Sequence, residues 1–309
     1  MSWTEGLPGV AQVELLRGAA AQGPPRLLIE VPHGADRRAH YDALLARLRG
    51  PLPPDLAAFF HVNTDVGAWD LGRALAQRVT ALDPAASVAL IRCLLPRTFV
   101  DTNRRLDVAP GALSQGGMTA GVPSYVRDPA DRALLSGLHA DYVGLVDAAV
   151  AQVCQAGGAV LSPHSYAPRS VDIDGIDDDI AAVLRAAWAP EQRERWPLRP
   201  AVDLISTTAQ GRNLGPVGVF AALRAALAPL GIEVADNATY HMHPATQGYR
   251  YALAWPGRVL CFELRRDLLV QRWEPFQEMA VDAVAIGRLA TALAPVVAGL
   301  VPVEGGRTA

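Results

Sequence analysis

Residues 26–36 read RLLIEVPHGAD, and the rest of the chain is arranged around this stretch. Its first part, residues 27–31, is a short apolar run with β-branched content and no helical period, which Pro32 and Gly34 bring to an end. Such a run is typical of a buried strand in a parallel or mixed sheet. The stretch therefore predicts a central strand followed by a tight turn.

The turn after this strand carries side chains that can bind a metal ion. His33 stands where the strand ends, and Asp36 follows three residues later. Sites in open α/β sheets form outside the carboxyl ends of the strands. Imidazole nitrogen and carboxylate oxygen both suit zinc, so an H-x-x-D turn can hold one divalent ion. A hydrogen-bonded structural histidine is the alternative, and the choice depends on the rest of the chain.

Composition limits the classes of function. The chain has 309 residues, of which 19% are charged, with a formal net charge of −3. This balance offers no basic surface for nucleic acid or for an anionic membrane. The N-terminus lacks the basic segment and apolar core of a signal peptide. The three cysteines lie far apart in apolar segments, so we expect reduced thiols and a cytoplasmic protein.

The order of the predicted elements indicates the fold class. Strands are expected at 11–16, 27–31, 87–95, 159–162, 202–206, 232–235 and 258–264, and helices at 41–48, 71–82, 131–156, 217–230 and 278–300. Alternating strands and helices predict a three-layer α/β/α fold with a mixed, mostly parallel central sheet. We expect a single domain over 1–309, with a lead-in at 1–24, loop insertions at 107–130 and 168–200, and a tail at 303–309.

Two further strand ends carry chemically active side chains. His164 follows the expected strand at 159–162 in the segment LSPHS, which resembles EVPHG around His33. Three protein ligands with an open fourth position is the catalytic pattern for zinc, although the same ligand types accept iron, cobalt or nickel. Glu263 lies inside the apolar run VLCFEL, where a carboxylate needs a partner or a task. It is a general base, the partner of a neighbouring arginine, Arg265 or Arg266, or an outward-facing residue at an edge position.

The segment PRTFVDTNRRLD places polar side chains around a short apolar stretch. Arginine pairs bidentately with a carboxylate, and Asn103 beside Arg104 adds a donor. Arg97 could polarise a carbonyl and hold the oxyanion that develops there. A solvated pair of surface arginines is the alternative reading.

Taken in order, VPHGAD, HVNTDVGA, PRTFVDTNRR, SPHSY and CFELRRDLL resemble the motifs of the N-formylglutamate amidohydrolase family over roughly residues 26–270. That family is related in fold to zinc carboxypeptidases and aspartoacylase. The resemblance implies that His33, Asp36 and His164 are the zinc ligands and that Glu263 is the general base. It also implies that Arg97 polarises the carbonyl and that Asn103 and Arg104 hold the substrate carboxylate. Asp65, the aspartate of D-x-G-A, is the alternative third ligand or supports a ligand histidine.

One stretch departs from the family pattern. The usual N-x-P-Y-x-G-G is represented only loosely by HMHPATQGYRYA, which contains His241, His243 and Tyr249. We expect Tyr249 to contact the substrate. The two histidines are candidates for substrate or metal contact, with exposed loop residues as the alternative. The departure leaves the acyl-amino acid open.

These observations predict a zinc-dependent hydrolase of the linear amide bond in a small N-acyl amino acid, such as N-formyl-L-glutamate. A carboxypeptidase or amidase with a larger substrate is the neighbouring alternative. A metal-free binding module on the same fold is the third possibility, since the shorter side chain at Asp36 reaches less far than a glutamate.

Overall fold

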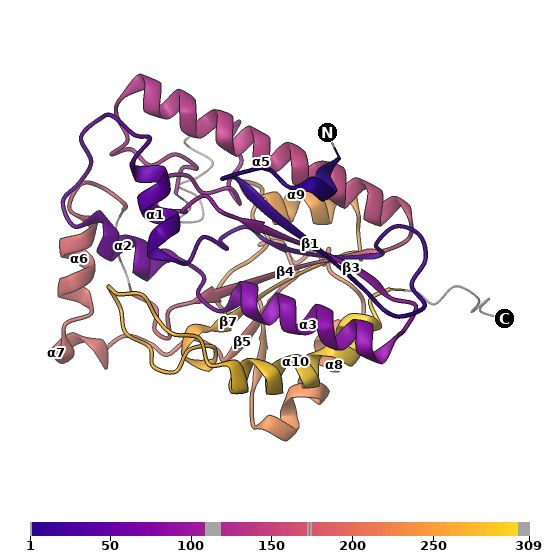
Figure 1. The fold of residues 1–309 in the computed structure, drawn as a ribbon. Coiled ribbons are helices and arrows are strands. Elements are labelled where there is room, and N and C mark those ends of the chain that lie inside the picture. The colour runs from indigo at the N-terminus through magenta and orange to yellow at the C-terminus, as the bar shows by residue number, and fades with distance from the viewer. Residues whose placement is uncertain (1, 109–118, 172, 174, 302–309) are drawn as a thin grey trace.

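The computed structural model describes residues 2–108, 119–171, 173 and 175–301 (Figure 1). The inner part of the expected loop at 107–130 and the expected tail at 303–309 lie outside the described residues. The strands are β1 (Ala11–Arg17), β2 (Leu27–Val31), β3 (Ser87–Cys93), β4 (Ala159–Tyr166), β5 (Val202–Ile205), β6 (Val234–Asp236) and β7 (Val259–Arg265).

The α-helices are α1 (Arg38–Leu45), α2 (Leu56–Asn63), α3 (Ala68–Leu82), α5 (Pro129–Gln155), α6 (Ile180–Ala187), α7 (Pro190–Arg193), α8 (Val219–Leu227), α9 (Gln247–Ala254) and α10 (Ala283–Ala298). Short 3-10 helices are η1 (Trp3–Glu5), η2 (Ala228–Leu230) and η3 (Arg266–Leu268).

The seven strands form one mixed sheet in the order β1-β3-β2-β4-β7-β5-β6. The four central strands β3, β2, β4 and β7 are parallel, whereas β1 and the β5–β6 pair run antiparallel to them. The central strands are almost continuously buried, as expected for a sheet covered on both faces. The predicted fold class is confirmed.

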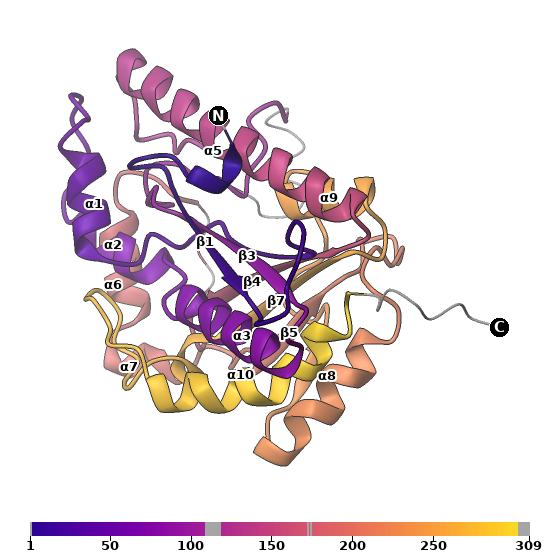
Figure 2. The same cartoon turned by 45° about the vertical axis from the view of Figure 1, so that its right-hand side comes forward.

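Two hydrophobic cores lie on opposite faces of the sheet. Helix α5 covers one face, and α3, α8 and α10 cover the other, as both views show (Figures 1 and 2). Helix α5 is long and apolar enough to cross a membrane by composition alone, but 44% of its most apolar window is buried inside the fold. That burial is typical of a core helix.

Pro163 of β4 lies where the pairing between β2 and β4 ends, at the centre of the sheet. The N–H of Ala159 donates to the carbonyl of Arg26, just before β2, and the N–H of Val160 donates to the carbonyl of Arg258, just before β7. The backbone groups of odd-numbered residues in β4 therefore point toward β2. Pro163 has no N–H to offer in that direction. The β2–β4 pairing ends at Ile29 and Leu161, while β4 continues to pair with β7 up to Tyr166. The sheet therefore opens between β2 and β4 at their carboxyl ends.

Several predicted boundaries were wrong. Strand β4 runs through Pro163 to Tyr166, so His164 lies within the strand because β7 supports it beyond the end of the β2 pairing. Helix α5 begins two residues earlier than expected, capped by Asp128 with Pro129 in its first turn. Helix α10 begins later than predicted, at Ala283.

Four helices were not predicted. Helices α6 and α7 lie inside the expected loop at 168–200, and α2 and α9 are short segments of one or two turns. Segments of four to eight residues hold few apolar repeats, so a helical period is recognised in some of them, as at 41–48, and missed in others.

Candidate metal centre

Three ligating atoms converge at the opening between β2 and β4. The Nδ1 atoms of His33 and His164 lie 3.2 Å apart, and Asp65 Oδ2 lies 3.2 Å from the first and 2.9 Å from the second. All three residues are buried. Among the described residues, His33, Asp65 and His164 form the group of three side chains whose ligating atoms lie close enough together to hold one metal ion.

The turn between α2 and α3 places Asp65 beside both histidines. Thr64 donates its hydroxyl to the carbonyl of Ala35, just beyond His33, and Ser165 of β4 donates to the carbonyl of Val66. Gly67 follows with φ +84°, and a Cβ there would lie 2.6 Å from Leu269. The turn is thus tied to the segments on both sides of the opening, and it requires glycine at its end.

In a metal-bound state, the hydrogen bonds that the two histidines make through Nε2 would leave both Nδ1 atoms as acceptors. His33 Nε2 lies 2.8 Å from Asp101 Oδ1, so this nitrogen carries the proton. Ser162 donates its only hydroxyl proton to Glu30 (3.0 Å), so it accepts from His164 Nε2 at 3.4 Å. Carboxylate and serine groups therefore fix the ring orientations in the way that outer ligands orient metal-binding histidines.

The three converging atoms fit a divalent cation. With both rings protonated at Nε2, two lone pairs and a carboxylate oxygen face one point with no proton between them. Ligands at 2.0–2.1 Å in tetrahedral arrangement are separated by about 3.3 Å, close to the separations seen here. Two imidazoles and one carboxylate suit zinc and other first-row divalent ions.

The electrostatics also favour positive charge at this point. Burial would raise the pKa of Asp65, but His33 and His164 outweigh it, so that pKa is lowered. Burial would lower the pKa of His164, but its hydrogen bond with Asp65 and the nearby carboxylate of Glu263 raise it. Without an ion, the cluster tends to take up a proton instead.

Glu263 lies beside the cluster on the neighbouring strand. It is paired with His164 in the register of β4 and β7, on the same face of the sheet. Burial raises its pKa to about 7, with a further contribution from the charge of Asp65. Oε2 is buried and has no hydrogen-bond partner among the described residues. A carboxylate with this pKa can exchange protons near neutral pH.

The neighbouring arginines do not neutralise Glu263. Arg265 pairs with Asp267 at 2.8 Å, and Arg266 donates to the carbonyls of Val62 (2.8 Å) and Ser165 (3.1 Å). The alternative of a salt bridge between Glu263 and one of these arginines is therefore wrong.

The loop after β3 brings two more arginines to the cluster. Arg97 Nε donates to Asp101 Oδ2 at 3.2 Å, and its Nη1 lies 3.9 Å from Asp65 Oδ1. Arg104 is buried, with Nη1 3.7 Å from Asp101 and with Nε unpartnered among the described residues. Asn103 accepts from Gly248 N–H through Oδ1 at 3.3 Å, and its amide N–H groups have no hydrogen-bond partner among the described residues.

Other predicted residues lie elsewhere. Asp36 is buried 2.6 Å from Arg92 and does not join the cluster, so the expected grouping with His33 and His164 is corrected to one with Asp65. His241 is exposed, and His243 accepts through Nδ1 from the N–H of Ala245 at 3.1 Å.

Tyr249 lies in the first turn of α9, where its N–H donates to the Thr246 hydroxyl at 3.2 Å and its partly buried side chain packs against the hydrophobic core. The described contacts do not place its hydroxyl at the metal cluster, so substrate contact stays a prediction.

Two residues were missed from the sequence. Asp101 is the aspartate within PRTFVDTNRR, and its place between two arginines in sequence was a signal. Glu30 is a carboxylate inside a buried strand, the same signal that drew attention to Glu263.

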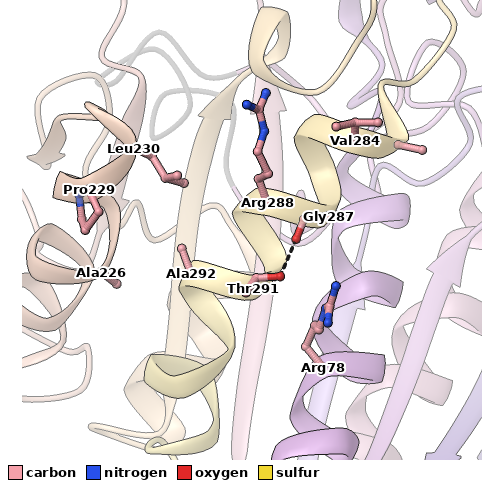
Figure 3. Close-up of a pocket in the computed structure, with 10 residues that line it drawn as sticks. Arg78, Ala226, Pro229, Leu230, Val284, Gly287, Arg288, Thr291 and Ala292 are labelled. Atoms are coloured by element: carbon pink, nitrogen blue, oxygen red, sulfur yellow. Dashed lines mark hydrogen bonds between the residues drawn. The ribbon is translucent and has the colours of Figure 1, made fainter.

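A hollow of about 590 Å³ lies away from this centre, between α8, α10 and Arg78 of α3 (Figure 3). Its lining includes the guanidinium groups of Arg78 and Arg288 but no carboxylate or histidine, and none of the cluster residues. It offers no groups for proton transfer or metal binding.

A family model described as N-formylglutamate amidohydrolase matches residues 26–270. No curated protein matches the chain. Among solved structures, a gene product of Agrobacterium tumefaciens has a TM-score of 0.54 at 18% identity, with 94% of each chain covered. N-formylglutamate amidohydrolase from Ralstonia eutropha has a TM-score of 0.51 at 18% identity, covering 95% of this chain and 98% of that one. A metallo-carboxypeptidase from Burkholderia cenocepacia has a TM-score of 0.38 at 12% identity, covering 96% of this chain and 66% of that one.

Proposed function

The chain belongs to the N-formylglutamate amidohydrolase family, as its five sequence motifs predicted, and we propose that it hydrolyses the amide bond of a small N-acyl amino acid with a bound zinc ion. N-formyl-L-glutamate is the first substrate to test. The observation that carries the proposal is the convergence of three ligating atoms from His33, Asp65 and His164.

These three side chains would hold the ion. A divalent ion there supplies a Lewis acid, which polarises an acyl carbonyl and lowers the pKa of a water molecule to about 7 in favourable cases. Asp101 and the Ser162–Glu30 pair keep the two rings turned toward it. Asp65 replaces Asp36 as the proposed carboxylate ligand, because Asp36 is engaged by Arg92.

Glu263 would move the protons of the reaction. Its carboxylate takes a proton from the attacking water and then delivers it to the leaving amine nitrogen. The raised pKa suits both steps, since the group is ionised above pH 7 and holds a proton readily once it has one. Its unpartnered Oε2 is free for this exchange.

Arginine side chains would bind and orient the substrate. Arg97, on the Asp65 side, can donate to the acyl oxygen as negative charge develops on it. Arg104 and the free amide N–H groups of Asn103 can hold a carboxylate of the amino acid. The positive charge of a divalent ion together with Arg97 and Arg104 would exceed the negative charge of Asp65, Asp101 and Glu263, which favours an anionic substrate.

The test measures release of formate from N-formyl-L-glutamate, of acetate from N-acetyl-L-glutamate and of free glutamate from peptides that end in glutamate. We expect turnover of an N-acyl amino acid by the zinc-loaded protein, loss after chelation, and recovery when zinc is restored. Activity on peptides alone would indicate a carboxypeptidase. Tight binding of the acyl amino acid without turnover at any metal load would contradict hydrolysis.

A further inference from the structure

We propose that Arg92 and Asp36 form a clamp that positions His33 for metal binding. The inference deepens the proposed function and rests on it, because His33 is one of the three proposed ligands. In this arrangement Arg92 is a positioning residue that does not touch the ion or the substrate. The carboxylate of the H-x-x-D stretch acts through Arg92 and is not itself a ligand.

The turn after β2 is held through its backbone on both sides of His33. The hydroxyl of Thr102 donates to the carbonyl of Pro32, just before His33, at 2.9 Å. Arg92 Nε donates to the carbonyl of Gly34, just after His33, at 2.8 Å. Two donors from outside the turn therefore fix the peptide groups that flank the histidine, and Arg92 is the charged one of the two.

The same guanidinium group also holds a buried carboxylate at the end of the turn. Arg92 Nη2 donates to Asp36 Oδ1 at 2.6 Å, and Asp36 is only 1% exposed. Arg37 Nε lies farther away, 3.6 Å from the same oxygen, and Asp36 Oδ2 has no hydrogen-bond partner among the described residues. Charge-assisted hydrogen bonds of this length are strong, and a buried charge that loses its partner is costly. One planar fork thus ties together two points of the turn that carries His33.

Arg92 is itself anchored to the sheet and to α3. It is paired with Val31, the last residue of β2, in the parallel register of β2 and β3. Its guanidinium carbon lies 5.3 Å from the ring centroid of Trp69, in the helix that follows Asp65. A Cβ on Gly34 would lie 2.5 Å from Arg92 Cγ, so a side chain there would displace the arginine. The clamp therefore joins the His33 turn to the elements on the Asp65 side of the centre.

The position of this turn decides whether the His33 ring meets its partners. Its Nδ1 lies 3.2 Å from Asp65 Oδ2, and its Nε2 lies 2.8 Å from Asp101 Oδ1. Metal sites require ligand atoms within about 0.5 Å of their productive positions. Asp101 sets the orientation of the ring, whereas the clamp sets the backbone position from which the ring extends. Loosening the turn would therefore disturb both contacts together.

The first test measures zinc affinity by chelator competition. We expect Arg92→Gln and Arg92→Lys each to weaken zinc binding by roughly 10-fold, because lysine keeps the charge but lacks the fork. Asp36→Asn keeps an acceptor oxygen for Arg92 and should lie closer to wild type. Arg73→Gln is the matched control, because Arg73 also donates to a carboxylate, that of Glu14 at 3.0 Å, but is exposed. Affinities of the Arg92 variants equal to wild type would overturn the clamp.

Nuclear magnetic resonance of the histidine rings in the metal-free proteins gives a second readout that needs neither zinc nor turnover. The ring proton that His33 Nε2 donates to Asp101 should give a downfield signal, which Asp101→Asn identifies by its loss. His139, whose Nε2 lies 2.7 Å from the carbonyl of Arg104, provides an internal reference for an intact fold. We expect Arg92→Gln to broaden or abolish the His33 signal and to leave that of His139 unchanged.

This second readout separates the clamp from the proposed function. A selective loss of the His33 signal supports the clamp even if wild type binds no zinc and the proposed function fails. If Arg92→Gln unfolds and loses both signals, the same comparison is decided by Arg92→Lys. An unchanged His33 signal, with only a lower unfolding free energy in urea, would overturn the clamp, because Arg92 would then stabilise the fold without positioning the ring.

Discussion

Replacing Glu263 by Gln should abolish turnover and, in the metal-free protein, stabilise the fold at alkaline pH. Burial raises the pKa of Glu263 from 4.5 to about 7. A carboxyl whose pKa is raised on folding binds its proton more tightly in the folded state, so its ionisation costs stability as the pH rises from 4.5 to 7. Gln has nearly the same shape and no such cost.

The size of this effect follows from the two pKa values. Between pH 5 and pH 8, the difference in unfolding free energy between the variant and the wild type should shift by about 2 to 3 kcal/mol in favour of the variant. Urea unfolding of the chelated proteins at both pH values measures it. A variant that is less stable than wild type at pH 8 would show that Glu263 is a structural ion-pair partner and would refute this reasoning.

The kinetic part of the same prediction concerns the zinc-loaded enzyme. Loss of a general base should lower kcat by about 10²- to 10⁴-fold while the metal content stays the same. Wild-type activity should fall at low pH, because protonation removes the base. The bound cation lowers the pKa of Glu263 below its metal-free value of about 7 and so moves this limb toward 4.5. Full turnover by the variant would exclude Glu263 as the base.

Other substitutions test the surroundings of the site. Asp101→Asn should weaken zinc binding by about 10- to 100-fold in a chelator competition, since His33 Nε2 loses its carboxylate; unchanged affinity would exclude this role. Tyr142→Phe removes the 2.7 Å donor to Glu30 and should lower the unfolding free energy by about 1–3 kcal/mol in urea, with a neutral result contradicting the network. Gly158→Ala should cost about 1–3 kcal/mol in the same assay, because its Cβ would lie 2.1 Å from the carbonyl oxygen of Arg26; a protein as stable as wild type would show that the two segments can separate freely.

The central strand and the two histidines could be predicted from the sequence because each rests on local chemistry. An apolar run that ends in Pro and Gly predicts a strand end, and a histidine there is placed near the edge of the sheet. Glu263 could be found in the same way, since a carboxylate in an apolar strand is costly without a function.

The choice between Asp36 and Asp65 could not be made from spacing. Asp36 is closer to His33 in sequence, but Arg92 of β3 donates to its carboxylate and also to the carbonyl of Gly34 at 2.8 Å. That contact depends on which strand lies beside β2.

Metal content measured by mass spectrometry tests the central claim most directly. The proteins are wild type, Asp65→Ala and Asp36→Asn, purified without a metal-affinity tag and supplied with zinc. About one zinc ion per chain is expected in wild type and in Asp36→Asn, with loss in Asp65→Ala. A wild-type protein that holds no metal, or zinc lost from Asp36→Asn but kept in Asp65→Ala, would contradict the proposed centre.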